Sequence, residues 1–139
     1  MGKKLDEDVR RLLDAPNFAH LATLMEDGAP KVEPTWVGRD GDFVLIATDS
    51  RGIKGRNIAR DARVALSVIA FDNPYEQALI RGKVVETRED NDLVVLDAMS
   101  QQYIGSEFPR RKWSSRVVYV IEASVARYYQ SPLKHTPSA

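Results

Sequence analysis

The sequence contains no cysteine, so it offers no disulfide framework, no thiol nucleophile and no cysteine-ligated zinc site. It also has no excess of either charge, because 20 Lys and Arg residues balance 20 Asp and Glu residues. A bulk electrostatic attraction to nucleic acid or to a membrane surface is therefore not indicated. Any anion site in this chain must come from local clustering of charge.

Long hydrophobic runs are also missing, and none approaches the length of a membrane span. Residues 1–8 turn acidic directly after Lys3 and Lys4 and lack the apolar stretch of a signal peptide. Histidine is scarce, and the distant pair of His20 and His135 predicts no metal site. We expect a cytoplasmic protein without a metal ion.

The 139 residues, 43% hydrophobic and 29% charged, match one globular domain. We expect this domain over 1–130, followed by a flexible tail over 131–139. Three short helices are predicted, at 5–14, within 49–61 and at 88–103. Apolar and alternating segments predict six strands, at 18–25, 31–37, 43–48, 64–71, 78–87 and 116–129.

Turn signals set the expected pairing of these strands. Glu26-Asp27-Gly28 is a hairpin signal, and 39–42 and 72–75 are further turns. Successive hairpins favour an antiparallel sheet, and closing it into a barrel removes its exposed edges. Pro34 indicates an edge strand or a bulge with unpaired backbone, and Gly82 indicates a bulge.

The two later helices carry expectations of their own. Within 49–61, Ile53 and Ile58 are expected to face inward and the basic residues outward. Thr87 is the expected cap of the helix at 88–103. Its acidic residues Asp90, Asp92 and Asp97 are expected on a solvated face.

The clearest functional signal is the segment 48–57, which follows a strand and enters a helix. Exposed N–H groups at a helix start, with glycine allowing close approach, form an anion site. This segment is not a P-loop, because the Gly-Lys-Ser/Thr ending is missing. A solvated basic helix face explains the same charges, so both interpretations stay open. The side-chain donors of the segment 48–57 are the cations Arg51, Lys54 and Arg56 and the hydroxyls of Thr48 and Ser50.

Residues 54–68, KGRNIARDARVALSV, resemble the K-x-R-N-L-x-R-D-P-R-V-A-L-S segment of the pyridoxamine 5'-phosphate oxidase-like FMN-binding split barrels. They are most similar to the branch that uses the deazaflavin coenzyme F420. Ala62 departs from the pattern, which usually has proline there. The resemblance covers roughly residues 8–128. Further matches occur in the same order at 20–24, 27–28, 34–37, 72–75 and 81–86.

The resemblance implies a mainly β (α+β) fold, namely a six-stranded antiparallel split β-barrel with a few short helices. It also implies a homodimer with two cofactor sites at the subunit interface. The strand containing Pro34, Thr35 and Trp36 would place its backbone against the ring system. The phosphate would fall on Arg51, Lys54 and Arg56, with Thr48, Ser50 and Asn57 beside it.

A second basic cluster spans 110–116, and in a dimer it could reach the partner's cofactor. F420 carries an acidic oligoglutamate tail, and such a tail favours a basic groove containing Arg110 and Arg111. A solvated loop explains the same charges. Trp36 and Trp113 could stack on a planar ring or belong to the core.

The expected function is an F420-dependent oxidoreductase that passes a hydride from the reduced deazaflavin to an unsaturated or quinone-like small molecule. No catalytic residue stands out, so we expect the proton to come from solvent. FMN as the cofactor is an alternative, and so is a non-catalytic carrier of a cofactor such as haem. A nucleic-acid module on a small barrel is disfavoured by the zero net charge, and no membrane partner is expected.

Overall fold

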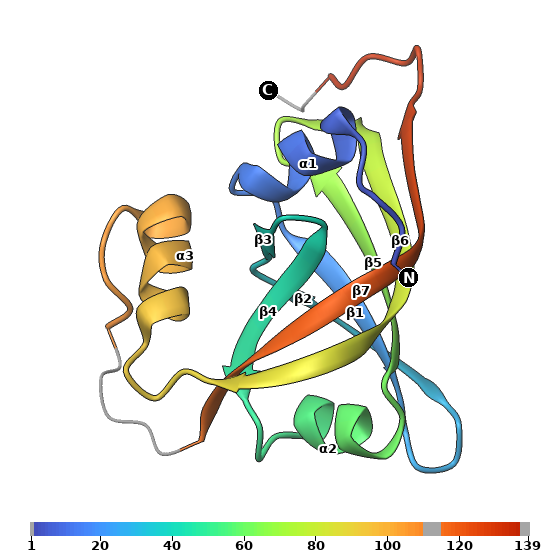
Figure 1. The fold of residues 1–139 in the computed structure, drawn as a ribbon. Helices are drawn as coiled ribbons and strands as arrows, with labels where there is room; N and C mark the ends of the chain where they lie inside the picture. The colour runs from blue at the N-terminus through green and yellow to red at the C-terminus, as the bar shows by residue number, and fades with distance from the viewer. Residues whose placement is uncertain (1, 110–114, 137–139) are drawn as a thin grey trace.

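The computed structural model describes residues 2–109 and 115–136, which form three helices and seven strands (Figure 1). The helices are α1 (Glu7–Asp14), α2 (Ile53–Arg60) and α3 (Val94–Ile104). The strands are β1 (Ala19–Leu24), β2 (Pro30–Thr35), β3 (Gly38–Asp40), β4 (Phe43–Asp49), β5 (Arg63–Ala70), β6 (Asn73–Glu89) and β7 (Arg116–Gln130).

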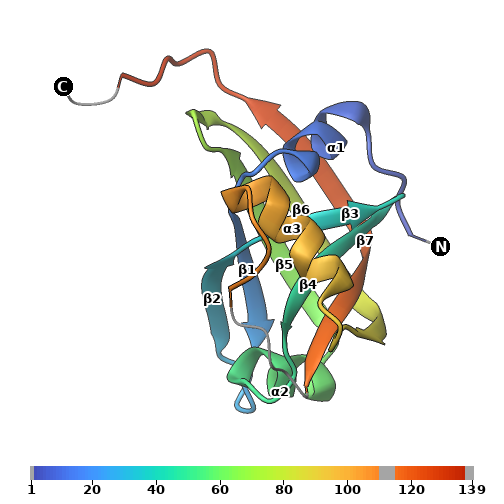
Figure 2. The ribbon, with the colours of Figure 1, turned by 90° about the vertical axis from the view of Figure 1, so that its left-hand side faces the viewer.

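The strands form one antiparallel sheet in the order β2-β1-β5-β6-β7-β4-β3. The prediction of a mainly β, antiparallel split-barrel fold is confirmed. The number of strands was wrong: the sheet has seven, because the expected turn at 39–42 begins with the short strand β3. The sheet curls strongly but is not closed (Figures 1 and 2).

The two edges of the sheet, β2 and β3, are consecutive in the chain. Only Trp36 and Val37 lie between them, so the split of the barrel is spanned by the chain itself. The Tyr103 hydroxyl accepts a hydrogen bond from the Val37 amide at 3.0 Å and lies 2.5 Å from the Asn17 carbonyl oxygen, to which it donates. A side chain from α3 therefore satisfies the backbone at the split, where no strand partner is present.

The barrel interior is the main core, formed by the inward residues of β1, β4, β5, β6 and β7. Alternation is clear on β5, where Val64, Leu66 and Val68 are buried. The helix α1 covers one end of the barrel, and α2 lies at the opposite end (Figure 1). Ile58 of α2 joins the core as predicted, whereas Ile53 is 44% exposed and does not face inward.

The helix α3 packs on the outside of β4 and β7, where Leu45, Met99, Val118 and Val120 form a second cluster. Thr87 is not its cap, because β6 continues through Thr87 to Glu89. The N-cap position is Leu93, and Asp90, three residues earlier, binds the first turn: its carboxylate accepts from the amides of Val95 at 3.0 Å and Leu96 at 3.1 Å.

Two smaller expectations about this region are also corrected. Asp90 is 4% exposed and therefore does not lie on a solvated face. Burial of this carboxylate is tolerated because it accepts two backbone hydrogen bonds. Asp97 accepts from the Phe108 amide at 3.0 Å, so it ties the helix to the chain that follows. The expected turn at 72–75 is shorter, because β6 already begins at Asn73.

Pro34 marks an edge strand and Gly82 marks a bulge, as predicted. Pro34 lies on β2, an edge strand that pairs only with β1. The register of β6 against β7 shifts between Arg81 and Gly82, which confirms the bulge. A Cβ on Gly82 would collide with the Glu122 carbonyl oxygen, so the close approach of the two strands requires glycine there.

Among the described residues, no helix has the length and apolar character needed to cross a membrane. Beyond β7, the Ser131 amide donates to the Tyr75 carbonyl oxygen at 2.9 Å. The domain boundary at residue 130 and the flexibility of the tail stay predictions.

Candidate functional site

The predicted anion segment connects the end of β4 to the start of α2. Asp49 closes this turn, because its carboxylate accepts from the Arg51 amide at 2.9 Å and from the Arg51 guanidinium at 3.0 and 3.2 Å. The Ser115 hydroxyl donates to the same carboxylate at 2.7 Å. Hydrogen bonds from Arg51, then from Ser115, hold the pKa of Asp49 well below its ordinary value. The turn is therefore preformed, and the Arg51 side chain remains 65% exposed.

The first turn of α2 has no side-chain cap, because its N-cap residue is Gly52. Among the described residues, the cap and first turn of α2 include no acidic side chain to offset the positive end of the helix dipole. Ser50 packs against the same turn, and a Cβ on Gly55 would collide with its carbonyl oxygen. Gly55 is therefore needed for the tight β4–α2 connection.

Lys54 lies on the first turn of α2 and reaches across to the edge strand β2. Its ammonium lies 3.3 Å from one carboxylate oxygen of Glu33, and the Lys31 ammonium lies 3.1 Å from the other. The Lys54 side chain is only 15% exposed, so it is held in place. This contact brings two predicted segments together: the phosphate segment and the strand expected against the ring.

Two predicted residues face the protein interior. Asn57 is 1% exposed, and its amide donates to the Thr23 hydroxyl at 3.0 Å. Thr48 is 9% exposed, at the last inward position of β4. Arg56, by contrast, is exposed on α2. The described contacts of Asn57 anchor α2 to β1, and its role toward a cofactor stays a prediction.

An aromatic cluster lies just beyond the end of β2, the predicted ring-binding strand. Trp36 stacks on Tyr103 with ring centroids 5.0 Å apart and meets Phe108 edge-on at 6.1 Å. Trp36 also packs against the cluster beneath α3, so one face of its ring has a structural role. Pro34 is exposed and lies opposite His20 of β1. Thr35 is half-buried at the end of β2.

The second basic cluster falls mostly on residues that lie outside the described ranges, including Arg110, Arg111 and Trp113. Its C-terminal flank is described. The Ser115 carbonyl oxygen accepts from the amide of Ser50 at 3.0 Å and from its hydroxyl at 3.2 Å. The flank of the second cluster is therefore bonded to the β4–α2 turn, although more than sixty residues separate them in sequence.

Sequence reasoning missed Lys31, Glu33, Asp49 and Ser115. A signal was available for the first two: Lys31 and Glu33 are two residues apart on a predicted strand, so they share one face. The pattern Asp49-Ser50-Arg51 is also typical of an aspartate that caps its own turn. Ser115 could not be placed, because nothing in the sequence brings it to β4.

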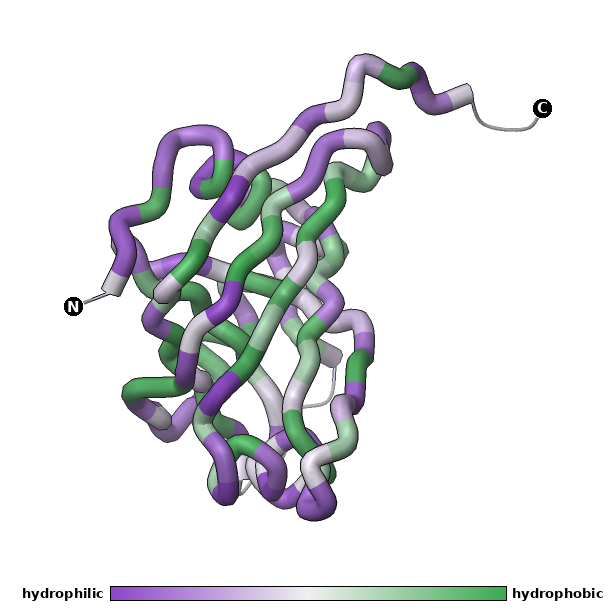
Figure 3. Tube along the Cα trace, turned by 90° about the vertical axis from the view of Figure 1, so that its right-hand side faces the viewer, coloured by the Kyte–Doolittle hydropathy of each residue, from purple (hydrophilic) through white to green (hydrophobic). Residues whose placement is uncertain are grey.

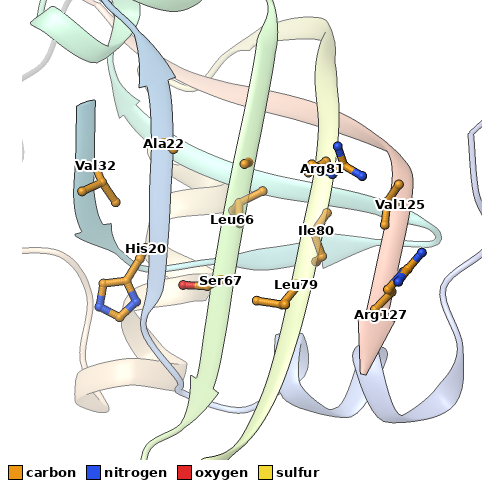
Figure 4. A pocket seen from close by; sticks show the side chains of 11 residues that line it. His20, Ala22, Val32, Leu66, Ser67, Leu79, Ile80, Arg81, Val125 and Arg127 are labelled. Atoms are coloured by element: carbon orange, nitrogen blue, oxygen red, sulfur yellow. The ribbon is translucent and has the colours of Figure 1, made fainter. Parts of the chain in front are cut away.

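A separate groove of about 490 Å³ lies on the outer face of the sheet (Figure 4). Outward positions of a solvated strand are normally polar. Here they include Val32, 66% exposed, and Leu79, 44% exposed. Figure 3, which faces the side of the sheet opposite α3, shows hydrophobic residues recurring along these strands. The groove is lined from five strands by His20, Ala22, Val32, Ala65, Ser67, Leu79, Arg81, Val125 and Arg127, among others.

No group of three or more His, Asp or Glu side chains within the described ranges could hold a metal ion. His20 lies in the outer groove, distant in sequence from the other histidine. The donors of the site are cationic side chains and backbone N–H groups, which suit an anionic ligand, and the carboxylates of Glu33 and Asp49 lie among them.

Comparison with known proteins supports one family. A solved structure named F420 reductase is 31% identical, with a TM-score of 0.81, and the match covers 88% of this chain and 98% of that one. A conserved hypothetical protein from Mycobacterium tuberculosis is 18% identical, with a TM-score of 0.70 and coverage of 97% and 92%. General Stress Protein 26 from Bacillus anthracis is 16% identical, with a TM-score of 0.69 and coverage of 93% and 97%.

The last two likenesses concern the fold alone. None of the curated proteins matches this chain in sequence. The family model described as pyridoxamine 5'-phosphate oxidase matches residues 5–130, almost the whole of the predicted domain. This chain therefore belongs to the pyridoxamine 5'-phosphate oxidase family.

Proposed function

We propose that this chain is an F420-dependent oxidoreductase that transfers a hydride from the reduced deazaflavin to an unsaturated or quinone-like small molecule. The observation that carries the proposal is the 31% identity to the structure named F420 reductase, at a TM-score of 0.81. The zero net charge and the local clustering of cations agree with a small anionic ligand rather than a nucleic acid.

The residues of the β4–α2 connection fit a phosphate group. Lys54 and the exposed Arg51 guanidinium supply charged donors, and the uncapped first turn of α2 supplies backbone N–H groups. Ser50 adds a hydroxyl beside them, and Arg56 and Thr48 complete the proposed set. Asn57 supports the site from beneath, through its hydrogen bond to Thr23.

We assign the ring system of the cofactor to the edge strand β2. Backbone groups of β2 that face away from β1 have no strand partner, so Pro34, Thr35 and Trp36 can lie along a planar ring. When bound, the reduced deazaflavin supplies a hydride, and the protein supplies binding and orientation. We assign the proton that completes the reduction to solvent.

The acidic tail of F420 is assigned to Arg110 and Arg111. Support comes from the flank of that segment, since Ser115 is bonded to both Asp49 and Ser50. FMN has a phosphate and lacks this tail, and the donors of the β4–α2 connection suit it equally. The family description, pyridoxamine 5'-phosphate oxidase, favours FMN as the second candidate.

Fluorescence titration of the purified protein with F420 and with FMN tests this proposal. We expect F420 to bind, and Lys54→Ala to weaken its affinity roughly tenfold to a hundredfold, because a charged hydrogen bond is lost. The matched control is Lys134→Ala, an exposed lysine in the tail. Tight FMN binding without F420 binding would favour the second candidate. Unchanged affinity in the Lys54 variant would refute the phosphate assignment.

A turnover assay separates an enzyme from a carrier. Reduced F420 bound to the protein should be oxidised when quinones or activated alkenes are added. If bound, reduced F420 stays unoxidised with a broad panel of such acceptors, the protein is a non-catalytic carrier. We also propose a cytoplasmic location, which the lack of cysteine supports.

We further propose that the protein is a homodimer that buries the outer groove. The support is the apolar character of this face: Val32 on the edge strand β2 and Leu79 on β6 are exposed, where a solvated sheet would carry polar residues. Light scattering should give twice the chain mass of 15.6 kDa. A monomeric mass at micromolar concentration would contradict this assignment.

A further inference from the structure

We propose that Glu33 is a built-in competitor for the anion site, and that Lys31 is an additional cation of that site. In the free protein the Glu33 carboxylate occupies the place between the two ammonium groups to which a phosphate would bind. Glu33 would thereby set how tightly the site holds a phosphate. This inference rests on the proposed function, because it concerns the same phosphate site.

The geometry of the three side chains carries the proposal. Each carboxylate oxygen of Glu33 faces one ammonium, Lys31 at 3.1 Å and Lys54 at 3.3 Å. One negative charge is thus shared by two positive charges, which leaves the cluster with a net charge of +1. Each ammonium has three donors, so neither is saturated by a single carboxylate oxygen.

The position of the cluster points to a ligand rather than to a surface ion pair. Lys31 and Glu33 lie on one face of the edge strand β2, and Lys54 reaches them from the uncapped first turn of α2. Their side chains are 28%, 34% and 15% exposed, respectively, so they are partly withdrawn from solvent. Charges in such a place interact more strongly than charges in open water.

Glu33 is ionised at neutral pH. Burial raises its pKa, but the hydrogen bond from Lys31 and the ion pair with Lys54 outweigh burial and bring the pKa below its ordinary value. A phosphate that approaches Lys54 therefore meets a carboxylate of the same sign. Removing that negative charge should strengthen phosphate binding, whereas removing Lys31 should weaken it.

The alternative is that Glu33 only ties β2 to α2. A structural ion pair would affect any ligand of the site equally, or none. A competitor for phosphate would affect only ligands that carry a phosphate. The test therefore uses two pairs of probes: FMN with riboflavin, which lacks only the phosphate, and F420 with its deazaflavin chromophore, which lacks both the phosphate and the acidic tail.

Binding of all four probes is measured by fluorescence for the wild type, Glu33→Gln and Lys31→Ala. For the phosphate-bearing probe that binds, we expect Glu33→Gln to raise the affinity roughly threefold to tenfold, and Lys31→Ala to lower it by about the same factor. The affinity for the phosphate-free partner should change less than twofold in both variants. Glu26→Gln, an exposed acid on the turn before β2, is the control for the loss of one negative charge.

Glu33→Asp keeps the charge and should stay within about twofold of the wild type, and Lys31→Ala keeps the proposal testable if Glu33→Gln folds poorly. Unchanged or weaker phosphate binding in Glu33→Gln, with Lys54→Ala still weakening it, would overturn this inference alone. An equal change for both members of a pair would also overturn it. Failure of Lys54→Ala to weaken any probe would instead refute the proposed phosphate site.

Discussion

At one end of the barrel α1 has a side-chain cap, and at the other end α2 has none. The Asp6 carboxylate accepts from the Val9 amide at 3.0 Å, whereas Gly52 makes no such bond. The helix α1 buries three apolar side chains, Val9, Leu12 and Leu13. The buried residues of α2 are Gly55, Asn57 and Ile58, so its packing face is smaller and partly polar.

The partners of the basic side chains also differ between the two ends. Arginines at the α1 end pair with acids from other elements, such as Arg10 with Asp42 at 2.6 Å and Arg39 with Asp14 at 2.6 Å. At the α2 end, Lys54 pairs with Glu33 of β2, but Arg51 pairs with an acid of its own turn and stays exposed. The α1 end therefore has a capped helix with a larger apolar face, while the α2 end has an uncapped helix and an exposed arginine.

The largest effect is expected from a cavity in the core at the α1 end. Leu13→Ala removes a fully buried side chain from the core under α1, and we expect a loss of about 2–5 kcal/mol in the free energy of unfolding. Chemical denaturation measures this loss. Leu133→Ala, at a position 61% exposed in the tail, is the control and should change little. Cofactor affinity of the folded Leu13 variant should stay unchanged. A large loss of affinity would contradict the separation of the two ends.

A smaller effect is expected when α2 is given a side-chain cap like that of α1. The backbone of Gly52 is extended, with φ −74° and ψ 175°, so other residues fit there. Gly52→Asp should stabilise the helix by a few tenths of a kcal/mol and weaken F420 or FMN binding about tenfold, because a carboxylate then occupies the helix N-terminus. Gly52→Ser supplies a neutral cap and should weaken binding much less. Equal binding by wild type and Gly52→Asp would count against the helix N-terminus as a phosphate ligand.

The smallest effect concerns pH at the α1 end. Glu76 accepts from Arg11 and from the Tyr128 hydroxyl, and these bonds lower its pKa below the ordinary value of 4.5. The folded state therefore binds this proton less tightly than the unfolded state. Glu76 stabilises the protein above about pH 4.5, and this contribution disappears as the pH falls through the lower, folded-state pKa.

Thermal melts of wild type and Glu76→Gln between pH 7 and pH 3 check this linkage. The difference in Tm should be present at pH 7 and shrink below pH 4.5. A difference independent of pH would mean that Glu76 stabilises through packing alone. Phosphate binding at the α2 end should be the same in both proteins at pH 7.

Local chemistry explains which parts of the fold could be predicted. The hairpin at Gly28, the edge position of Pro34 and the bulge at Gly82 follow from turn and backbone preferences. The strand β3 could not be predicted, because it has only three residues, all paired with β4, and so shows no alternating pattern in the sequence. Thr87 was misread as a helix cap because nothing local shows that β6 continues beside β7 as far as Glu89.

The candidate site was predictable where its residues are adjacent in sequence. Arg51 lies on the β4–α2 connection and Lys54 on the first turn of α2, so the segment 48–57 leads from a strand into a helix as predicted, while its role as a phosphate site stays a prediction. Glu33 was missed, because its carboxylate meets Lys54 only after β2 and α2 are brought together. Ser115 was missed for the same reason, since its bond to Asp49 joins residues distant in sequence. A cluster of charged residues within one segment can be recognised in a sequence, whereas the residues that contact this cluster from another segment cannot.

The strand order has a consequence for how the chain assembles during synthesis. β7 lies between β6 and β4, so the first half of the sheet is joined to the β3–β4 hairpin only through the last strand to be made. Until β7 has left the ribosome, β4 has no partner except β3, and its apolar residues Val44, Leu45 and Ile46 stay uncovered on that side. Non-local pairing of this kind is slow. The sheet therefore stays incomplete until β7 has been synthesised and has paired, and apolar surface that favours aggregation is exposed during that interval.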